Sequence, residues 1–246
     1  GKLLAPYNFY INKKCIKKAP YAIYVTQEYL QKLPSNKGLN SGWSNVKLVD
    51  TVTKPKIWSF ANLNDITINI VTTSPVNIKF RGHDNVFEAL SLFKKAGFSY
   101  KYYLIGGGSQ LRLKKLAKKL DIADEIVFLG KLSHQDVLSY LDKFDLYIHP
   151  SKSEGLPRAL IEAMSRALPC LAARTSGNPE LLDDEFIFSK GSSLELYEIL
   201  ISLNSEILTR MSTLNLERSK NYLYPILNDR RKCFFKLIKD ENTTGY

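Results

Sequence analysis

From residue 65 onwards, short apolar runs alternate with segments whose apolar positions recur at helical spacing. The short runs are typical of buried strands, and the longer segments each carry one apolar stripe, as amphipathic helices do. Strands that alternate with helices predict an α/β fold with a doubly wound parallel sheet. The six predicted strands are 65–73, 100–105, 125–130, 145–150, 169–173 and 186–189.

Local signals mark the ends of several predicted helices. Gly97 is expected to stop the first helix, because glycine accepts the left-handed conformation at a helix C-terminus. Ser133 and Asp136 predict a capping box at the start of a later helix. The predicted helices are 83–97, 110–122, 134–144, 157–168, a short one at 179–184, and helical structure from about 192 that closes with 224–242.

The first 62 residues hold fewer regular elements. Residues 1–20 are basic and irregular in pattern, and we expect them to present a solvated helix face, with an anionic membrane contact as the alternative. A strand at 21–25, a helix capped by Thr26, a glycine-containing loop and a strand at 45–50 are expected to follow. A segment of about 60 residues with so few elements cannot close a core of its own.

Charge and composition narrow the class of partner. The chain has 35 Lys and Arg against 24 Asp and Glu, a net charge of +11, which favours nucleotide phosphates, an acidic membrane face or nucleic acid. Three distant cysteines without CxxC spacing indicate a reducing compartment and no metal site. We see neither a secretory signal nor an apolar run of membrane-spanning length. Because the sequence begins with Gly1, we expect its natural start to lie outside it.

Candidate chemistry concentrates after the strand at 145–150. A small, polar loop leads into a helix with Pro157 in its first turn, and a helix N-terminus at that edge of a parallel sheet suits a phosphate. Glu154 and Glu162 lie eight residues apart around the helix start, and carboxylates facing one cleft suit a ligand rich in hydroxyls. The pattern therefore favours a nucleotide-sugar. A solvated surface helix, with Glu154 as a partner of the helix dipole, remains equally open.

Two glycine-containing loops extend the candidate site. Lys79 and Arg81 lie between the first strand and first helix of the alternation, where cations could clamp a diphosphate or be exposed basic residues. Gly106 and Gly107 follow the next strand and would allow a ligand to approach, although a tight turn also explains them. They do not form a dinucleotide-binding motif, because Leu111 stands where that motif needs a third glycine.

The three histidines carry weaker signals. His83 and His134 stand at predicted helix starts, where we expect surface or capping residues. His149 ends a buried strand beside the glutamate loop, and we expect a structural histidine with satisfied hydrogen bonds, ligand contact being the alternative. The spacing of His, Asp and Glu does not suggest a metal site, and basic and aromatic residues do not form a nucleic-acid platform.

Taken together, these motifs resemble one enzyme family. SEGLPRALIEAM (153–164) resembles the E-x7-E motif of the family 4 glycosyltransferases with a GT-B fold. The segments 105–141 and 81–90 resemble the strands and helices that precede this motif in the family's donor-binding domain. The resemblance implies the Rossmann-like C-terminal half of a GT-B fold with a truncated N-terminal domain. Its parts would be a remnant of the acceptor-side domain (1–62), the nucleotide-sugar donor-binding domain (63–215) and a crossover helix (216–246).

By this resemblance the chain is a retaining, hexosyltransferase-type enzyme that moves a sugar from a nucleotide-sugar to an acceptor hydroxyl without metal or cofactor. Glu154 would contact the donor sugar and stabilise its developing positive charge, and Glu162 would bind the ribose. Arg81, with Lys79, would neutralise the leaving diphosphate. The remaining donor contacts would be Gly106 and Gly107 at the phosphates, Lys131 and Leu132 at the base, and Ser153, Gly155 and Leu156 at the diphosphate and sugar.

The implied acceptor is a glycan or lipid-linked saccharide in bacterial surface polysaccharide biosynthesis. The implied location is the cytoplasm, with an anionic membrane surface as a candidate partner at its inner face and without nucleic acid. Three alternatives stay open: a nucleotide-sugar-binding module inactive in transfer because most of the acceptor domain is missing, a sugar-nucleotide epimerase, and a basic nucleic-acid-binding domain.

Overall fold

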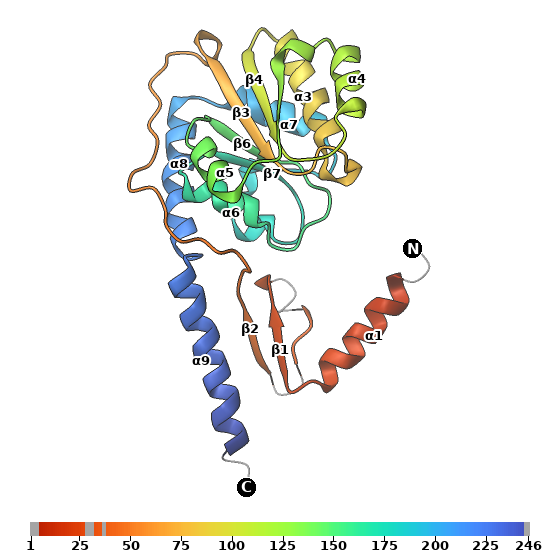
Figure 1. Ribbon diagram of the computed structural model, residues 1–246, viewed down its shortest axis with the longest axis vertical. Coiled ribbons are helices and arrows are strands. Elements are labelled where there is room, and N and C mark those ends of the chain that lie inside the picture. The colour runs from red at the N-terminus through yellow and green to blue at the C-terminus, as the bar shows by residue number, and fades with distance from the viewer. Residues whose placement is uncertain (1–4, 28–31, 36–37, 244–246) are drawn as a thin grey trace. The chain divides into compact units, whose positions relative to one another are not determined.

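The computed structural model describes residues 5–27, 32–35 and 38–243. Their contacts divide the chain into two units: a larger one from residues 48–222, and a smaller one from residues 1–47 together with 223–246 (Figure 1). Each unit has its own sheet. The candidate site residues all belong to the larger unit.

The larger unit is built on a parallel sheet of six strands in the order β5-β4-β3-β6-β7-β8, which confirms the predicted doubly wound α/β fold. The order reverses at β3, which pairs with β4 on one side and with β6 on the other. The strands are β3 (Thr67–Thr73), β4 (Ser99–Ile105), β5 (Ile126–Gly130), β6 (Leu146–His149), β7 (Cys170–Ala173) and β8 (Ile187–Phe188).

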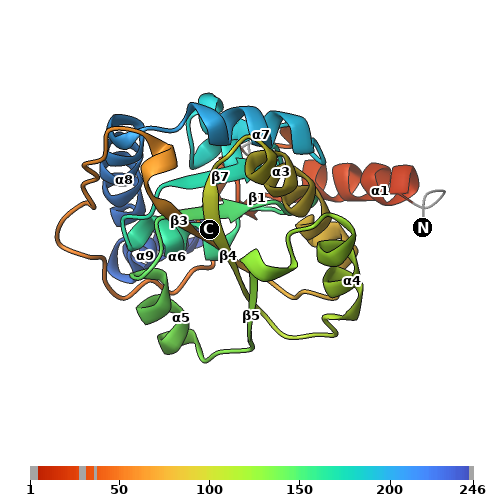
Figure 2. The ribbon, with the colours of Figure 1, turned by 90° about the horizontal axis from the view of Figure 1, so that it is seen from above.

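Helices cover both faces of this sheet (Figures 1 and 2). On one face α3 packs against α4 and α7, and on the other α6 packs against α5 and α8. The helices are α3 (His83–Lys95), α4 (Leu111–Lys119), α5 (His134–Leu141), α6 (Arg158–Ser165), α7 (Ser193–Ser202) and α8 (Ser205–Lys220).

The apolar core lies between the sheet and α3. Phe87 and Phe93 of α3 pack into one buried cluster with Ile70, Tyr102 and Ile148 of the central strands, all fully buried. The rings of Phe87 and Tyr102 meet edge to face, with centroids 6.0 Å apart. Burying an apolar side chain of this size contributes about 1.5–3 kcal/mol. The core therefore fixes the strands whose carboxyl ends carry the candidate site.

Residues 48–62 lie with the larger unit, although we expected them to belong with the first residues of the chain. The Val52 N–H donates to the Ser165 carbonyl (3.0 Å), and the Lys56 N–H donates to the Ser212 hydroxyl (2.8 Å). The Lys56 ammonium also donates to the carbonyls of Asp142 and Phe144 beyond the end of α5. These bonds tie the segment to α6 and α8 and explain why the larger unit begins at residue 48 and not at residue 63.

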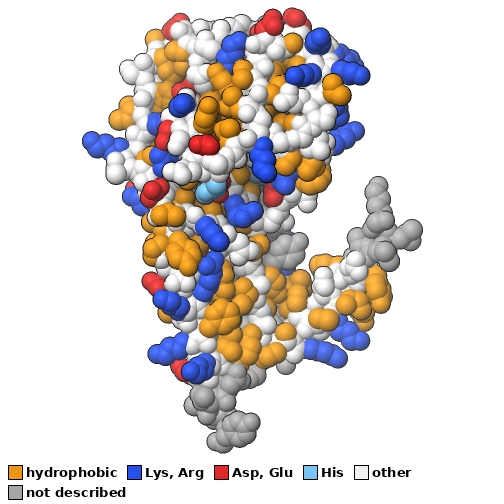
Figure 3. Space-filling model, in the orientation of Figure 1, with side chains coloured by type: hydrophobic (Ala, Val, Ile, Leu, Met, Phe, Trp, Pro, Cys, Tyr) orange, Lys and Arg blue, Asp and Glu red, His pale blue; other side chains and the backbone are white. Residues whose placement is uncertain are grey.

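The smaller unit contains α1 (Ala5–Lys18), the parallel strands β1 (Tyr21–Tyr24) and β2 (Leu39–Gly42), and the final helix α9 (Tyr224–Thr243). The predicted final helix is therefore confirmed. Within this unit the Trp43 ring packs against Phe234 of α9, with centroids 5.8 Å apart, and Arg231 donates to the Ser44 carbonyl. Figure 3 shows hydrophobic side chains gathered along α1, where Tyr7, Phe9 and Tyr10 are exposed.

The solvated helix face expected within residues 1–20 is confirmed, because α1 occupies most of this segment and its described side chains are mostly exposed. Three local predictions are wrong. Residues 45–50 do not form a strand; β2 forms instead in the expected loop, where pairing with β1 outweighs the weak strand propensity of its LNSG sequence. Two 3-10 turns, Asn178–Glu180 and Asp184–Phe186, replace the short helix at 179–184. Pro157 is the N-cap of α6 and precedes its first turn.

One further expectation is met in part. Ser133 caps α5 by accepting the Asp136 N–H (3.2 Å), but the Asp136 carboxylate accepts from the Ser133 hydroxyl (2.6 Å), whereas a capping box would use the Ser133 backbone N–H. The helix expected after Thr26 lies largely outside the described residues. Among the helices that the structure describes, none combines the length and apolarity needed to cross a membrane.

A close backbone approach joins the loops that follow β3 and β6. Gly82 has φ +78°, and a Cβ on it would overlap the Pro150 carbonyl oxygen. Beside it, the Lys152 N–H donates to the Phe80 carbonyl (2.8 Å). Only glycine meets both demands at this position, because other residues strain in the left-handed region and all of them carry a Cβ.

We expect Gly82→Ala to destabilise the larger unit by more than the about 1–2 kcal/mol of left-handed strain, because the two loops must also separate. Gly97→Ala is the matched control, since Gly97 has φ +91° and open space around a Cβ. Urea denaturation measures both. Equal losses of unfolding free energy in the two variants would show that separating the two loops costs no free energy.

Candidate functional site

The loops at the carboxyl edge of the large sheet are joined by backbone hydrogen bonds. The Ser74 N–H donates to the Ile105 carbonyl (2.9 Å), and the Val76 N–H donates to the Gly107 carbonyl (3.0 Å). The Gly106 N–H donates to the Gly130 carbonyl (2.8 Å). The loops after β3, β4 and β5 are thus one connected surface. In open α/β sheets, ligands bind at this edge where the strand order reverses, here between β3 and β6.

An ion pair crosses this reversal point. Arg81 belongs to the 3-10 turn Lys79–Arg81 after β3, and its Nη1 contacts Oε1 of Glu154 in the loop after β6. The side chains are 26% and 18% exposed, so the pair is partly screened by water but open to a ligand. Both residues were predicted to belong to one site, and the structure places them in direct contact.

Glu154 is surrounded by groups that favour its ionised form. Burial raises the pKa of its carboxyl group, but the neighbouring His149 imidazole, with smaller contributions from Ser151 and Arg81, outweighs burial and holds this pKa below its ordinary value. His149 Nε2 lies 3.6 Å from Glu154 Oε1. Glu154 is therefore a carboxylate at neutral pH, able to accept hydrogen bonds from hydroxyls or to face a positive centre.

His149 differs from our expectation of a satisfied structural histidine. Its ring is buried, yet Nε2 has no hydrogen-bond partner among the residues that the structure describes. Its Nδ1 lies 3.5 Å from the Tyr147 hydroxyl, which is 2.9 Å from Thr73 Oγ1. Tyr147 is not among the predicted site residues, although a tyrosine within a short, fully buried strand signals a phenol that needs an internal partner.

Glu162 has a separate partner. It lies in the second turn of α6, and its Oε1 is 3.0 Å from Nε2 of His134, the exposed first residue of α5. The loop that carries Lys131 and Leu132 leads directly into α5. A Cβ on Gly107 would lie 3.7 Å from that of Lys131. Glu162 is thus near the loops expected to hold the base, while Glu154 faces Arg81.

The other predicted residues lie in the same loops. Lys79 is exposed in the turn of Arg81, and the exposed Ser153 accepts a hydrogen bond at its carbonyl from the Ser151 hydroxyl. Gly155 and Leu156 contact the loop after β7, because a Cβ on Gly177 would overlap the Gly155 carbonyl oxygen. Gly177 is not among the predicted site residues, because its role depends on a close approach between distant loops. The functional roles of all these residues remain predictions.

His83 also contradicts its prediction as a surface or capping residue, because it is fully buried. Its Nε2 lies 3.0 Å from Ser74 Oγ and 3.3 Å from the Pro75 carbonyl oxygen. Burial lowers the pKa of His83 to about 4, chiefly because a charged imidazolium cannot be solvated there. The neutral ring therefore packs the loop after β3 against the start of α3.

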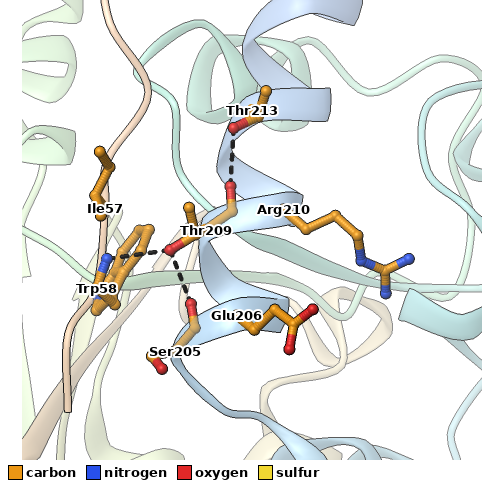
Figure 4. Close-up of a pocket in the computed structure, with 7 residues that line it drawn as sticks. All are labelled: Ile57, Trp58, Ser205, Glu206, Thr209, Arg210 and Thr213. Atoms are coloured by element: carbon orange, nitrogen blue, oxygen red, sulfur yellow. Dashed lines mark hydrogen bonds between the residues drawn. The ribbon is translucent and has the colours of Figure 1, made fainter.

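A cavity of about 520 Å³ lies elsewhere, between the segment Ile57–Trp58 and α8 (Figure 4). Thr209 Oγ1 accepts from the Trp58 N–H (3.2 Å) and donates to the Ser205 carbonyl (2.8 Å). Arg210 pairs with Glu185 (2.9 Å). These polar groups are already paired, and none of the predicted site residues lines the cavity. The described residues contain no group of three or more His, Cys, Asp or Glu that could hold a metal ion.

The sequence of the chain matches a known protein family. Residues 58–205, more than half of the chain, match the family described as Glycosyl transferases group 1. The chain belongs to this family.

Two relatives are similar in sequence over much of this chain. Protein CapJ of Staphylococcus aureus is 30% identical over 215 residues, which cover 85% of this chain and 52% of CapJ. The amylovoran biosynthesis glycosyltransferase AmsK of Erwinia amylovora is 29% identical over 171 residues, 65% of this chain and 39% of AmsK. The chain thus spans about half the length, or less, of these relatives.

Solved structures agree on the fold. Anabaena Alr3699/HepE, solved in complex with UDP-glucose, aligns with a TM-score of 0.72 and 17% identity over 97% of this chain and 69% of HepE. Sucrose-phosphate synthase from Thermosynechococcus elongatus aligns with a TM-score of 0.73 and 16% identity over 94% of this chain and 61% of that protein. These GT-B neighbours establish the fold, and at such identities they establish nothing more.

The buried His83 predicts a loss of stability in mild acid. Its pKa is about 4 in the folded chain against an unfolded value of 6.5, so only the unfolded chain gains a proton between these values. The free energy of unfolding should fall as pH drops from 6.5 towards 4, by about 1.4 kcal/mol per unit at most. Urea midpoints measured between pH 6.5 and 4 should change less with pH in His83→Gln than in the unaltered protein. His134→Gln, at an exposed histidine, should show the same change with pH as the unaltered protein. An unchanged slope in His83→Gln would contradict the assignment.

Proposed function

We propose that this chain provides the donor-binding part of a retaining glycosyltransferase that moves a sugar from a nucleotide-sugar to a glycan or lipid-linked acceptor in bacterial surface polysaccharide biosynthesis. The observation that carries the proposal is the Arg81–Glu154 pair at the strand-order reversal of a group 1 glycosyltransferase fold. Relatives support the pathway class: AmsK is named for amylovoran, and the putative WcaL glycosyltransferase of Escherichia coli for colanic acid. HepE supports the donor class, because it was solved with UDP-glucose.

The diphosphate would take the place of Glu154 as the partner of Arg81. Arg81 is held by one carboxylate in the structure, and a diphosphate offers it more negative charge and paired oxygens that match a guanidinium. Lys79 in the same turn adds a second cation. The N-terminus of α6 adds backbone N–H groups, although Pro157 at the N-cap has none to give. These groups supply the positive charge that a leaving diphosphate needs, so we expect no metal to be required.

Glu154, released from Arg81, would act on the sugar. Its ionised carboxylate accepts hydrogen bonds from hydroxyls of the donor sugar. It also stabilises the positive charge that develops at the anomeric carbon as the bond to the diphosphate breaks. The acceptor hydroxyl then forms the new bond from the same face, and its proton passes to the departing phosphate oxygen. Glu162, oriented by His134, would accept hydrogen bonds from the ribose hydroxyls. The loop with Lys131 and Leu132 would flank the base.

Glu154→Gln should abolish most sugar transfer by the full-length protein, because it removes the charge while keeping the shape. We expect kcat to fall about 100- to 1,000-fold, the range for losing one preorganised electrostatic contact. Glu162→Gln is the matched control and should mainly raise KM for the donor. Transfer of radiolabelled sugar from the nucleotide-sugar measures both. Near-normal turnover in Glu154→Gln would refute its role.

Arg81→Met should weaken binding of a nucleoside diphosphate about 10- to 100-fold and leave binding of the nucleoside unchanged, because the contact is with phosphate. UDP, GDP and ADP are first compared by thermal shift, and calorimetry then compares the diphosphate that stabilises most with its nucleoside. Arg210→Met, which removes the exposed Arg210–Glu185 pair, controls for a general loss of charge.

Equal losses for diphosphate and nucleoside would move the phosphate site elsewhere. Tight binding of a diphosphate by this 246-residue chain, without any transfer of sugar, would favour the binding-module alternative instead.

A further inference from the structure

We propose that His149 positions Glu154, that its imidazole carries the proton on Nε2, and that hydrogen bonds from Thr73 through Tyr147 fix this tautomer. The inference rests on the proposed function in one respect, namely that Glu154 is the carboxylate that acts on the sugar. The tautomer itself is a property of the chain without any ligand.

The first observation is an unpartnered buried nitrogen. His149 is 3% exposed, and its Nε2 lacks a hydrogen-bond partner within the described part of the chain. The nearest carboxylate oxygen is Glu154 Oε1 at 3.6 Å. His149 is held in a sheet strand, whereas Glu154 stands in a loop. A small rotation of the Glu154 side chain would therefore complete a hydrogen bond that the histidine already faces.

The second observation gives the hydrogen bonds a direction. A neutral imidazole has one donor nitrogen and one acceptor nitrogen. If the Thr73 hydroxyl donates to the Tyr147 oxygen (2.9 Å) and the phenol points its hydrogen at His149 Nδ1 (3.5 Å), then Nε2 carries the proton and faces the carboxylate. The reverse direction would set a bare nitrogen lone pair against the Glu154 oxygen, which is unfavourable. Burial also raises the pKa of Tyr147, so the phenol keeps its hydrogen.

The positioning explains how Glu154 could stay in place during donor binding. Arg81 and His149 both face Oε1 of Glu154, Arg81 from the turn after β3 and His149 from the end of β6. When a diphosphate draws Arg81 away, the His149 N–H remains to anchor Oε1 and leaves Oε2 free for the sugar. Without His149, the carboxylate would be a loop side chain with no fixed orientation, and catalysis depends on fixed orientation.

The chain contains a matched control for this arrangement. Tyr102 of β4 is fully buried, and its hydroxyl donates to Thr72 Oγ1 (2.7 Å), one residue from the Thr73 that meets Tyr147. Both phenols are buried and bond to adjacent threonines of β3, but only the bond of Tyr147 leads on to a histidine and a carboxylate. Tyr102→Phe therefore imitates the packing and hydrogen-bond loss of Tyr147→Phe without touching the proposed chain of bonds.

Nitrogen NMR of the full-length protein labelled with 15N-histidine tests the tautomer, with signals assigned through His134→Gln and His149→Gln. We expect His149 to carry its proton on Nε2 at neutral pH in the wild type and in Tyr102→Phe, and to become a mixture of tautomers in Tyr147→Phe. A wild-type proton on Nδ1 would overturn the inference. An unaltered tautomer in a folded Tyr147→Phe would equally overturn the role of Tyr147.

Kinetics test the positioning. With the donor that supports transfer, Tyr147→Phe should lower kcat about tenfold and His149→Met about 100-fold, with donor KM nearly unchanged, while Tyr102→Phe keeps wild-type kcat. His149→Gln should recover most of the loss, because its amide N–H can take the place of Nε2–H. If His149→Met and Tyr147→Phe are fully active while Glu154→Gln is inactive, the positioning role of His149 is rejected and the proposed function stands. An active Glu154→Gln would instead reject the proposed function.

Discussion

The contact between Arg81 and Glu154 depends on the close approach of Gly82 to the Pro150 carbonyl. These two loops leave neighbouring strands, β3 and β6, at the point where the strand order of the sheet reverses. A side chain on Gly82 would push the loops apart and separate a cation from a carboxylate that lie 73 residues apart in the sequence. A backbone constraint thus brings the candidate phosphate-binding and sugar-binding groups together in a member of the group 1 glycosyltransferases.

In the structure the charges of Arg81 and Glu154 offset each other. Removing either partner would leave the other charge partly buried without compensation, which is costlier than losing an exposed pair. A diphosphate can replace the carboxylate on Arg81, and His149 can replace the guanidinium on Glu154. Both charges would then keep a partner in the ligand-bound site. The same contacts would therefore serve stability before binding and orientation after it.

Periodicity predicted the architecture because it reports local burial. The strands of the large sheet are short segments rich in buried apolar residues, and the glutamate motif stands out because its spacing follows a helix start. The missing details depend on distant contacts. His83 is buried by the loops around Ser74, β2 forms because β1 pairs with it, and Gly177 matters because the loop of Gly155 lies against it. His149 was placed correctly beside Glu154, but its unpaired nitrogen depends on ring orientation.

The central claim is that Arg81 leaves Glu154 for a diphosphate at this edge of the sheet. A crystal structure of the full-length protein with the nucleoside diphosphate that stabilises it most tests this claim most directly. We predict phosphate oxygens within hydrogen-bond distance of Arg81, and the Glu154 carboxylate within hydrogen-bond distance of His149 Nε2. A diphosphate bound elsewhere, with the Arg81–Glu154 pair intact, would contradict the account.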